Sequence, residues 1–221
     1  LRALTPLAEA VRLAATAEAP IILADVADNP GGGGRGSTTK LLAALHAADV
    51  PGVVFGVFID PALAAEAHAA GEGAHLEAVF NRVESAFSQR FACGATGLKL
   101  SVGKAIGRRG ISAGTRFNLG PSALLRLDGS GMQVVVGSLR RQLAEPRMLE
   151  MHGIDIAQAR VLVVKSRGHF RAGFDEFVPP ERIYEVDCPG LTSPVLDSFA
   201  WKRLPRPIWP LEPETSWSDN M

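Results

Sequence analysis

Residues 20–49 have the sequence PIILADVADNPGGGGRGSTTKLLAALHAAD, and this stretch decides the fold. A nearly continuous apolar run over 21–26 is typical of a parallel strand that is covered on both faces. Pro30 ends the run, because proline lacks an N–H and does not fit inside a strand ladder. Leucines at helical spacing then predict a helix with Ser37 or Thr38 as its N-cap. The stretch therefore predicts a strand, a glycine loop and a helix, the first part of a parallel β-α-β unit.

The glycines of this loop exceed what a turn requires. Glycine is favoured where the backbone needs unusual dihedral angles or approaches another group closely. A loop at the positive end of a helix can offer free backbone N–H groups to an anionic or carbonyl oxygen. We therefore expect the loop to bind a ligand, and the alternative is a flexible connection without one. The candidate ligand-binding residues are Asp28, Asn29, Gly31, Gly32, Gly33, Gly34 and Ser37.

The glycine pattern does not match a nucleotide-binding loop. Gly31 and Gly36 have the spacing of a Walker A motif, but Ser37 occupies the position where that motif requires lysine. A dinucleotide fingerprint does not fit either, although Asp60 ends the next predicted strand. Nucleotide binding is therefore disfavoured.

The composition indicates a globular protein with a substantial core. The chain has 221 residues, 47% of them hydrophobic, and a formal net charge of zero, which favours neither a nucleic-acid nor a membrane-surface partner. Cys93 and Cys188 have no metal-binding spacing and form no disulfide framework, so we expect a reducing, cytoplasmic location. Because the chain starts with Leu1 inside a predicted helix, we expect a fragment of a longer protein.

The rest of the chain predicts further elements of an α/β fold with a small, mostly parallel sheet and flanking helices. They are a helix before the first strand, a second strand and its helix, two later strands, and an extended proline-rich tail that wraps the surface. In order, they cover 5–17, 52–59, 61–71, 161–164, 183–186 and 204–213.

The middle of the chain has a different texture, with short runs and recurrent glycine. Strand-like runs at 123–127 and 132–136 are joined by Asp-Gly-Ser-Gly, which is a hairpin signal. We predict that 74–143 is an inserted, barrel-like antiparallel β subdomain. Residues 1–73 and 144–221 would then form the α/β unit with its tail.

A second group of candidates follows the predicted strand at 161–164. The carboxyl ends of parallel strands lie at one edge of a sheet, so residues 165–171 should converge with the glycine loop and Asp60. Lys165 and Arg171 could bind a substrate carboxylate, and the alternative is an ion pair with a nearby acidic residue, namely Asp175, Glu176 or Asp187. His169 could contact substrate or serve in packing or capping.

Other reactive side chains are weaker candidates for a catalytic or metal-binding role. Asp25 and Asp28 should face opposite sides of a strand, and Asp28 is better interpreted as an Asx-type cap of the glycine turn. Ser37 and Ser166 lack the Gly-x-Ser-x-Gly elbow of a nucleophilic serine, and Cys188 is expected to be buried and inert. No two of the five histidines have zinc-binding spacing, so we expect this chain to bind no metal by itself.

Several motifs, in order along nearly the whole chain, resemble the C-terminal region of the microcystinase C (MlrC-like) zinc metallopeptidases. They are ADVADNPGGG at 24–33, GEGA at 71–74, FNR at 80–82, VVKSRGHFRAGF at 163–174, VDCPGLTSP at 186–194 and PRPIWP at 205–210. The segment 35–37, Arg-Gly-Ser, departs from the acidic or small residue expected there.

The resemblance implies a bacterial hydrolase that opens linearised peptides, among them a cyanobacterial hepatotoxin. It also implies that zinc and the catalytic carboxylate belong to an N-terminal domain absent from this chain, so no metal ligand or catalytic residue is assigned here. The glycine loop and residues Lys165, Ser166, His169 and Arg171 would line the cleft for a peptide or amide substrate.

Two hypotheses follow. In the first, the chain is the C-terminal region of a zinc-dependent peptidase or amidohydrolase, inactive alone, with the N-terminal domain of the same protein as its partner. In the second, it is a non-catalytic α/β module that holds a phosphate or carboxylate at the glycine loop. The sequence leaves a homodimer open.

Overall fold

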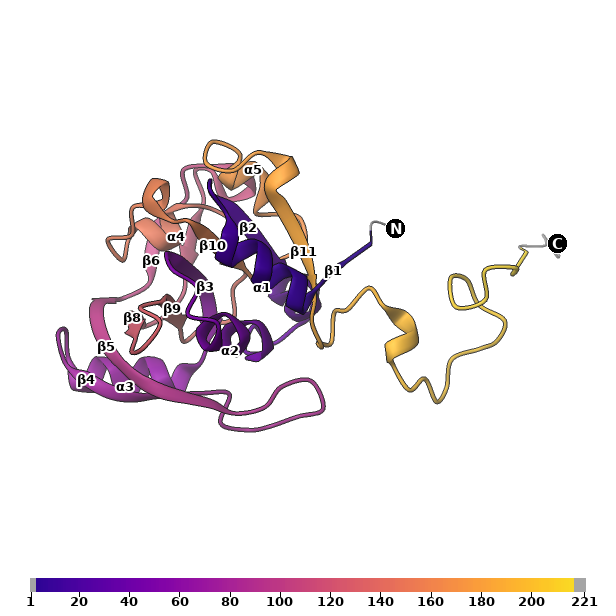
Figure 1. Cartoon of the computed structure of the whole chain (residues 1–221), viewed down its shortest axis with the longest axis horizontal. Coiled ribbons are helices and arrows are strands. Elements are labelled where there is room, and N and C mark those ends of the chain that lie inside the picture. The colour runs from indigo at the N-terminus through magenta and orange to yellow at the C-terminus, as the bar shows by residue number, and fades with distance from the viewer. Residues whose placement is uncertain (1–2, 217–221) are drawn as a thin grey trace.

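A computed structural model describes residues 3–216, and a nine-stranded sheet runs through the body of the molecule (Figure 1). The strand order is β1-β11-β2-β10-β3-β9-β8-β5-β4. Neighbouring strands from β1 to β9 in this order pair in parallel. The parallel strands are β1 (Thr5–Pro6), β2 (Ile21–Asp25), β3 (Val53–Ile59), β9 (Gln133–Gly137), β10 (Val161–Val164) and β11 (Ile183–Asp187).

The rest of the sheet is antiparallel and consists of β4 (His75–Phe80), β5 (Phe91–Ser101) and β8 (Ser122–Leu127) beside β9. These strands extend the parallel sheet, so the prediction of a barrel-like shape is wrong. The reason is β9, whose apolar Val134, Val135 and Val136 are buried on both faces, which makes it a central strand. The assignment of 74–143 as a separate domain stays a prediction.

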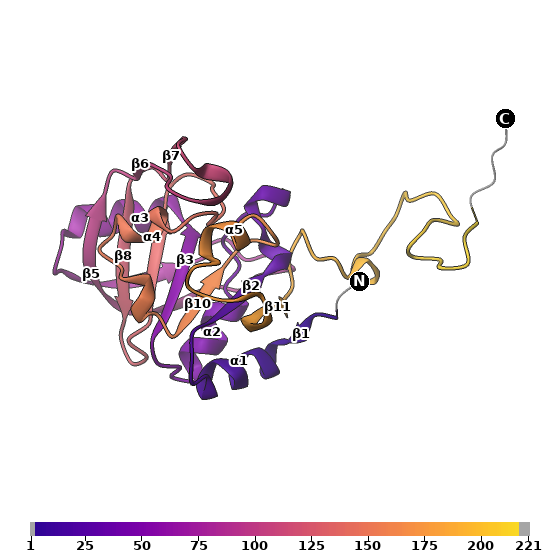
Figure 2. The same cartoon turned by 90° about the horizontal axis from the view of Figure 1, so that it is seen from above.

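Two short strands, β6 (Lys104–Ile106) and β7 (Arg116–Asn118), form a separate antiparallel pair. This β6–β7 pair lies beside the edge of the main sheet where the parallel strands end (Figure 2). It is the only part of the predicted insertion among the described strands that leaves the main sheet.

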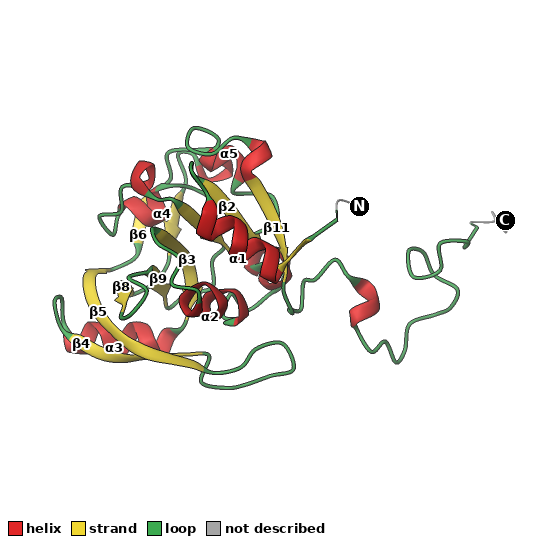
Figure 3. Cartoon of the chain, viewed as in Figure 1, coloured by secondary structure: helices red, strands yellow, loops and turns green. Residues whose placement is uncertain are grey.

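Helices cover both faces of the sheet (Figure 3). Alternate side chains of each buried strand point to opposite faces, so Leu23 joins one apolar core while Ile22 and Ala24 join the other. The first core also contains α1 (Leu7–Thr16), α2 (Lys40–Ala47) and α3 (Pro61–Ala70), and the second contains α4 (Arg147–Glu150) and α5 (Arg171–Phe174). The prediction of an α/β fold with a mostly parallel sheet and flanking helices is confirmed, but the sheet is large rather than small.

Local signals place α3 as the sequence predicts. Asp60 Oδ1 accepts a hydrogen bond from Leu63 N at 3.0 Å, and Pro61 occupies the first helical position. Gly71 ends the helix with φ of 94°. The helix therefore begins directly where β3 ends.

The sequence suggested that the C-terminal tail wraps the surface, but this prediction is wrong. The tail runs away from the sheet in two perpendicular views (Figures 1 and 2), and Trp201 and Trp209 are exposed along it. Within residues 3–216, no helix has the length and apolar character that crossing a membrane requires.

Candidate functional site

The candidate site lies at the carboxyl edge of the sheet, where β2, β10, β3 and β9 end. The glycine loop after β2 meets the end of β3, because Ile59 N donates to Gly36 O at 2.9 Å. It also meets the segment after β10, since Lys165 Nζ lies 3.0 Å from Asp28 Oδ2. The convergence of these junctions, predicted from parallel topology, is confirmed.

A buried ion cluster lies beneath the loop. Lys165 Nζ donates to Asp25 Oδ2 at 2.8 Å and to Asp28 Oδ2 at 3.0 Å. It also donates to the carbonyl oxygen and the hydroxyl of Thr38, both at 2.8 Å. All of these side chains are buried, and Lys165 has no exposed surface. The cluster fastens the end of β2, the far side of the loop and the end of β10 to one another.

The cluster corrects the expectation that Asp25 and Asp28 face opposite sides. The strand ends at Asp25, and Val26–Asp28 form a 3₁₀ turn. In a 3₁₀ turn, residues three apart lie on the same side, whereas strand geometry would separate them. Both carboxylates therefore reach the same ammonium group.

The charges in the cluster shift its pKa values in the direction of ion pairing. Burial alone would raise the pKa of Asp28, but the charge of Lys165 and the amides of Thr38 and Gly36 outweigh it, and the pKa is lowered. Burial alone would lower the pKa of Lys165, but the two carboxylates hold it above its usual value. Both groups are thus charged at neutral pH.

The position of Lys165 also corrects its predicted partners. The alternative to substrate binding was an ion pair with Asp175, Glu176 or Asp187, but the partners are Asp25 and Asp28 from the other end of the chain. Its ammonium also lies 5.6 Å and 5.7 Å from the ring centroids of Phe55 and Phe58. These contacts enclose Lys165 and leave it no direct route to a substrate carboxylate.

The backbone donors of the glycine loop are used within the loop. Gly31 N donates to Asn29 Oδ1 at 2.9 Å, which makes Asn29 rather than Asp28 the Asx cap of this turn. Gly32 and Gly34 donate to the carbonyl of Asn29, and Gly33 donates to that of Pro30. Across the loop, Asp28 accepts from Gly36 N and Thr38 N at 2.9 Å and 2.7 Å. The expectation of free loop amides that grip an oxygen is therefore wrong for these six groups.

Close packing explains the glycines better than a ligand does. A Cβ at Gly34 would lie 2.7 Å from Asn29 N and 2.8 Å from the carbonyl carbon of Asp28, which is too close for any side chain. Gly33 has open space around it, but its φ of 101° favours glycine. The loop is a folded structure that the side chains of Asp28 and Asn29 hold together from inside.

The exposed side of the loop borders a cavity of about 290 Å³, which we call the loop cavity. Gly31 lines it from the glycine loop and His169 from the segment after β10. His169 Nδ1 lies 2.6 Å from Gln142 Nε2, in the segment after β9. These contacts join three strand ends at one concave surface.

Arginines complete the wall of this cavity, and sequence reasoning missed them. Arg116 comes from β7, and Arg140 and Arg141 follow β9. Arg140 Nη1 lies 3.5 Å from Gly33 O, so it contacts the glycine loop directly. Recognition of 133–137 as a strand parallel to β3 would have indicated the last two, because their segment then ends at the carboxyl edge.

The remaining predicted residues lie apart from the loop cavity. Ser166 has no exposed surface, and its hydroxyl has no hydrogen-bond partner among the described residues. Arg171 Nη2 donates to Glu185 Oε1 at 2.8 Å, a different partner from those predicted. Gly32 packs beside Thr192, and Ser37 lines a separate cavity of about 160 Å³ with Asn81.

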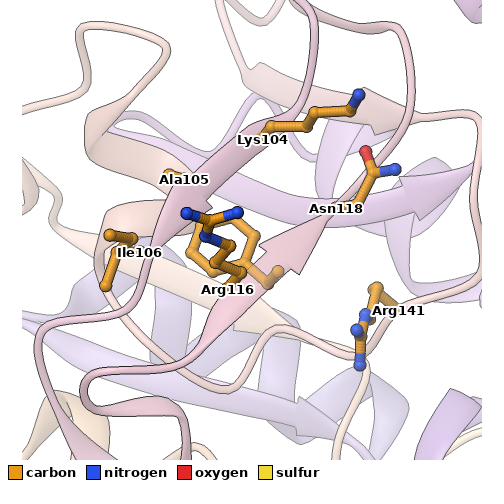
Figure 4. A pocket seen from close by; sticks show the side chains of 7 residues that line it. Lys104, Ala105, Ile106, Arg116, Asn118 and Arg141 are labelled. Atoms are coloured by element: carbon orange, nitrogen blue, oxygen red, sulfur yellow. The ribbon is translucent and has the colours of Figure 1, made fainter.

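A second cavity, of about 410 Å³, adjoins the first, and we call it the hairpin cavity (Figure 4). It shares Arg116, Phe117 and Arg141 with the loop cavity. Its other lining residues belong to the β6–β7 pair: Lys104, Ala105, Ile106 and Asn118.

The donor set for a zinc ion is not found in this part of the protein. Within residues 3–216, no three side chains of the types His, Cys, Asp and Glu lie together in a way that could hold a metal. Cys188 is buried, as predicted, and burial raises the pKa of its thiol. The described residues therefore do not fit a zinc site.

Comparison with known proteins gives concordant matches. The family model described as MlrC C-terminus matches residues 23–203. Microcystinase C from a Sphingomonas species is 29% identical over 209 residues, which cover 92% of this chain and 38% of that protein. A crystal structure of a candidate metallopeptidase from Mesorhizobium sp. BNC1 has a TM-score of 0.83 and 25% identity, covering 98% of this chain and 42% of that one. The chain thus spans about two fifths of the length of these relatives.

Proposed function

The chain belongs to the MlrC C-terminus family, and we propose that it is the C-terminal region of a metal-dependent peptidase or amidohydrolase. In this proposal the loop cavity faces the substrate, and the metal, expected to be zinc, is held by a further N-terminal part, for which the greater length of the relatives leaves room. The substrate would be a peptide or a small amide.

The observation that carries the proposal is the loop cavity at the carboxyl edge. In sheets with parallel strands, ligands bind outside the carboxyl ends of the strands. One exposed residue of each predicted segment, Gly31 and His169, lines this cavity together with Gln142. Concave surfaces of this size with a few convergent polar groups are typical of small-molecule sites.

The residues of this chain would position the substrate. Gln142 holds the imidazole of His169 through Nδ1, which leaves Nε2 of this exposed ring to contact the substrate or a group of the N-terminal part. The buried cluster of Lys165, Asp25 and Asp28 would fix the glycine loop against this site. Accurate positioning of a substrate can increase the reaction rate by a large factor.

A hydrolysis assay tests the proposal. The protein extended at its N-terminus to the length of its relatives should cleave linear peptides, and a chelator should abolish the cleavage. The 221-residue chain alone should cleave nothing. A metal-loaded extended protein without any hydrolase activity would overturn the proposal.

Gly33 offers a variant that probes the loop. Gly33→Val adds no clash, because nothing lies within 4 Å of its Cβ position, but it strains a backbone with φ of 101°. We expect lower kcat/KM for the extended protein with the fold retained. An unchanged kcat/KM would show that the glycine loop is not part of the substrate site.

A further inference from the structure

The hairpin cavity is strongly basic. Lys104 and Arg116 from the β6–β7 pair and Arg141 from the segment after β9 line it, and no acidic side chain of the described residues does (Figure 4). The same holds for the adjoining loop cavity, where Arg140 adds a further cation. Because the whole chain has a formal net charge of zero, the positive charge here is a local feature.

These cations differ from other arginines close by in the sequence. Arg108 and Arg109 are paired with three carboxylates from other segments. None of the ion pairs between described residues includes Lys104, Arg116 or Arg141. Acidic partners are thus available in this part of the fold, and the cavity cations are left without them.

Strand geometry points the donors to one side. Lys104 lies opposite Asn118, and Ile106 lies opposite Arg116, across the antiparallel pair. Residues in these positions share a face of a two-stranded sheet. Asn118 Oδ1 accepts from Gly120 N at 2.8 Å, so its amide N–H groups are the part that it can offer a ligand. The cavity therefore presents donors and cations.

The rest of the lining is apolar. Ile106 is exposed on the same face as the donors, whereas Ala105 and the buried Phe117 lie at the alternate positions of the pair. Together they line a cavity of about 410 Å³, within the range of ligand sites. A guanidinium group matches the two oxygens of a carboxylate, and an apolar wall favours a hydrocarbon body beside them. Inorganic phosphate would use the cations but not the wall.

We propose that the hairpin cavity binds a carboxylate carried on an apolar body, such as the free C-terminus of a short peptide. The identification of that ligand as a peptide substrate rests on the proposed function, whereas the preference for a carboxylate rests on this cavity alone. Arg116, Phe117 and Arg141 line both cavities, so a peptide anchored here continues into the loop cavity.

The test is calorimetric binding of a matched pair of ligands to the 221-residue chain at low salt. N-acetyl-phenylalanyl-leucine has a free carboxylate, and its C-terminal amide has the same body without the charge. We expect the acid to bind about tenfold or more tightly than the amide. Arg116→Ala and Arg141→Ala should each weaken binding of the acid about ten- to hundredfold and leave binding of the amide nearly unchanged.

Arg90→Ala is the matched control, because Arg90 is exposed, lines neither cavity and forms none of the ion pairs among the described residues. Equal binding of acid and amide, or insensitivity to both cavity variants, would overturn the proposal. Inorganic phosphate bound as tightly as the acid, or a single-stranded oligonucleotide bound more tightly, would also overturn it. Failure of the extended protein to hydrolyse peptides would refute the proposed function and leave this binding result standing.

Discussion

Replacement of Lys165 by methionine should destabilise the fold strongly. Methionine has a similar length but no charge, so Asp25 and Asp28 would remain buried without their cation. Removal of one partner from a buried ion cluster costs about 3–5 kcal/mol. The free energy of unfolding of a natural domain is about 5–15 kcal/mol, so this loss is a large fraction of it. For a chain of this size the melting temperature should fall by about 10 °C.

Urea unfolding followed by circular dichroism at pH 7 measures this loss. Lys40→Met is the control, since Lys40 is exposed at the start of α2, and surface substitutions change stability by about 0.5 kcal/mol or less. Asp25→Asn gives a sharper test. It should destabilise the wild-type chain but stabilise Lys165→Met, because in the variant it removes an uncompensated buried charge.

The loss should also depend on pH. In the wild type the pKa of Asp28 is lowered, so its contribution to stability is present above about pH 4 and is lost as pH falls. In Lys165→Met, burial without a cation should raise the pKa of Asp28, and protonation then removes the cost of its buried charge. The difference between wild type and variant should therefore shrink from pH 7 to pH 4. A loss below about 1 kcal/mol at pH 7, or Asp25→Asn acting with the same sign in both backgrounds, would refute the reasoning.

Two further predictions concern the core and the loop. Burial lowers the pKa of His152 to about 4, despite the opposing hydrogen bond to Met148 O. As pH falls, the unfolded chain therefore takes up a proton at this histidine before the folded chain does. The free energy of unfolding of the wild type should fall by about 3 kcal/mol between pH 6.5 and pH 4. His152→Gln should remove this part of the pH dependence of urea unfolding, and an unchanged curve would contradict the assignment. Gly34→Ala should cost about 1–3 kcal/mol, because its Cβ would meet backbone atoms. Gly168→Ala, in open space, should be neutral or slightly stabilising, and equal effects of the two would exclude close packing as the reason for Gly34.

The apolar runs of the sequence predict the parallel strands well, because strands covered on both faces leave a continuous hydrophobic signal. The same signal in β9 was assigned to a separate barrel-like unit, since its pairing with β3 brings together segments far apart in the chain. Pattern reasoning finds such strands but not their neighbours.

The convergence of the strand ends was predictable from the sequence, but the contacts made there were not. Strand periodicity separated Asp25 from Asp28, whereas the 3₁₀ turn joins them. The glycines suggested free amides, but Asp28 and Asn29 at the start of the loop supply the acceptors, and these short polar side chains were a signal for it. The arginines come from other strands, and no spacing in the sequence relates Arg116 to the loop.

A measurement of kcat/KM for peptide hydrolysis tests most directly whether the loop cavity faces the substrate. The metal-loaded extended protein would carry His169→Ala or Gln142→Ala, with Arg90→Ala as the control. We predict that the first two lower kcat/KM about 10²-fold with the metal content unchanged, while the control keeps wild-type activity. Wild-type kcat/KM in both cavity variants would contradict the assignment.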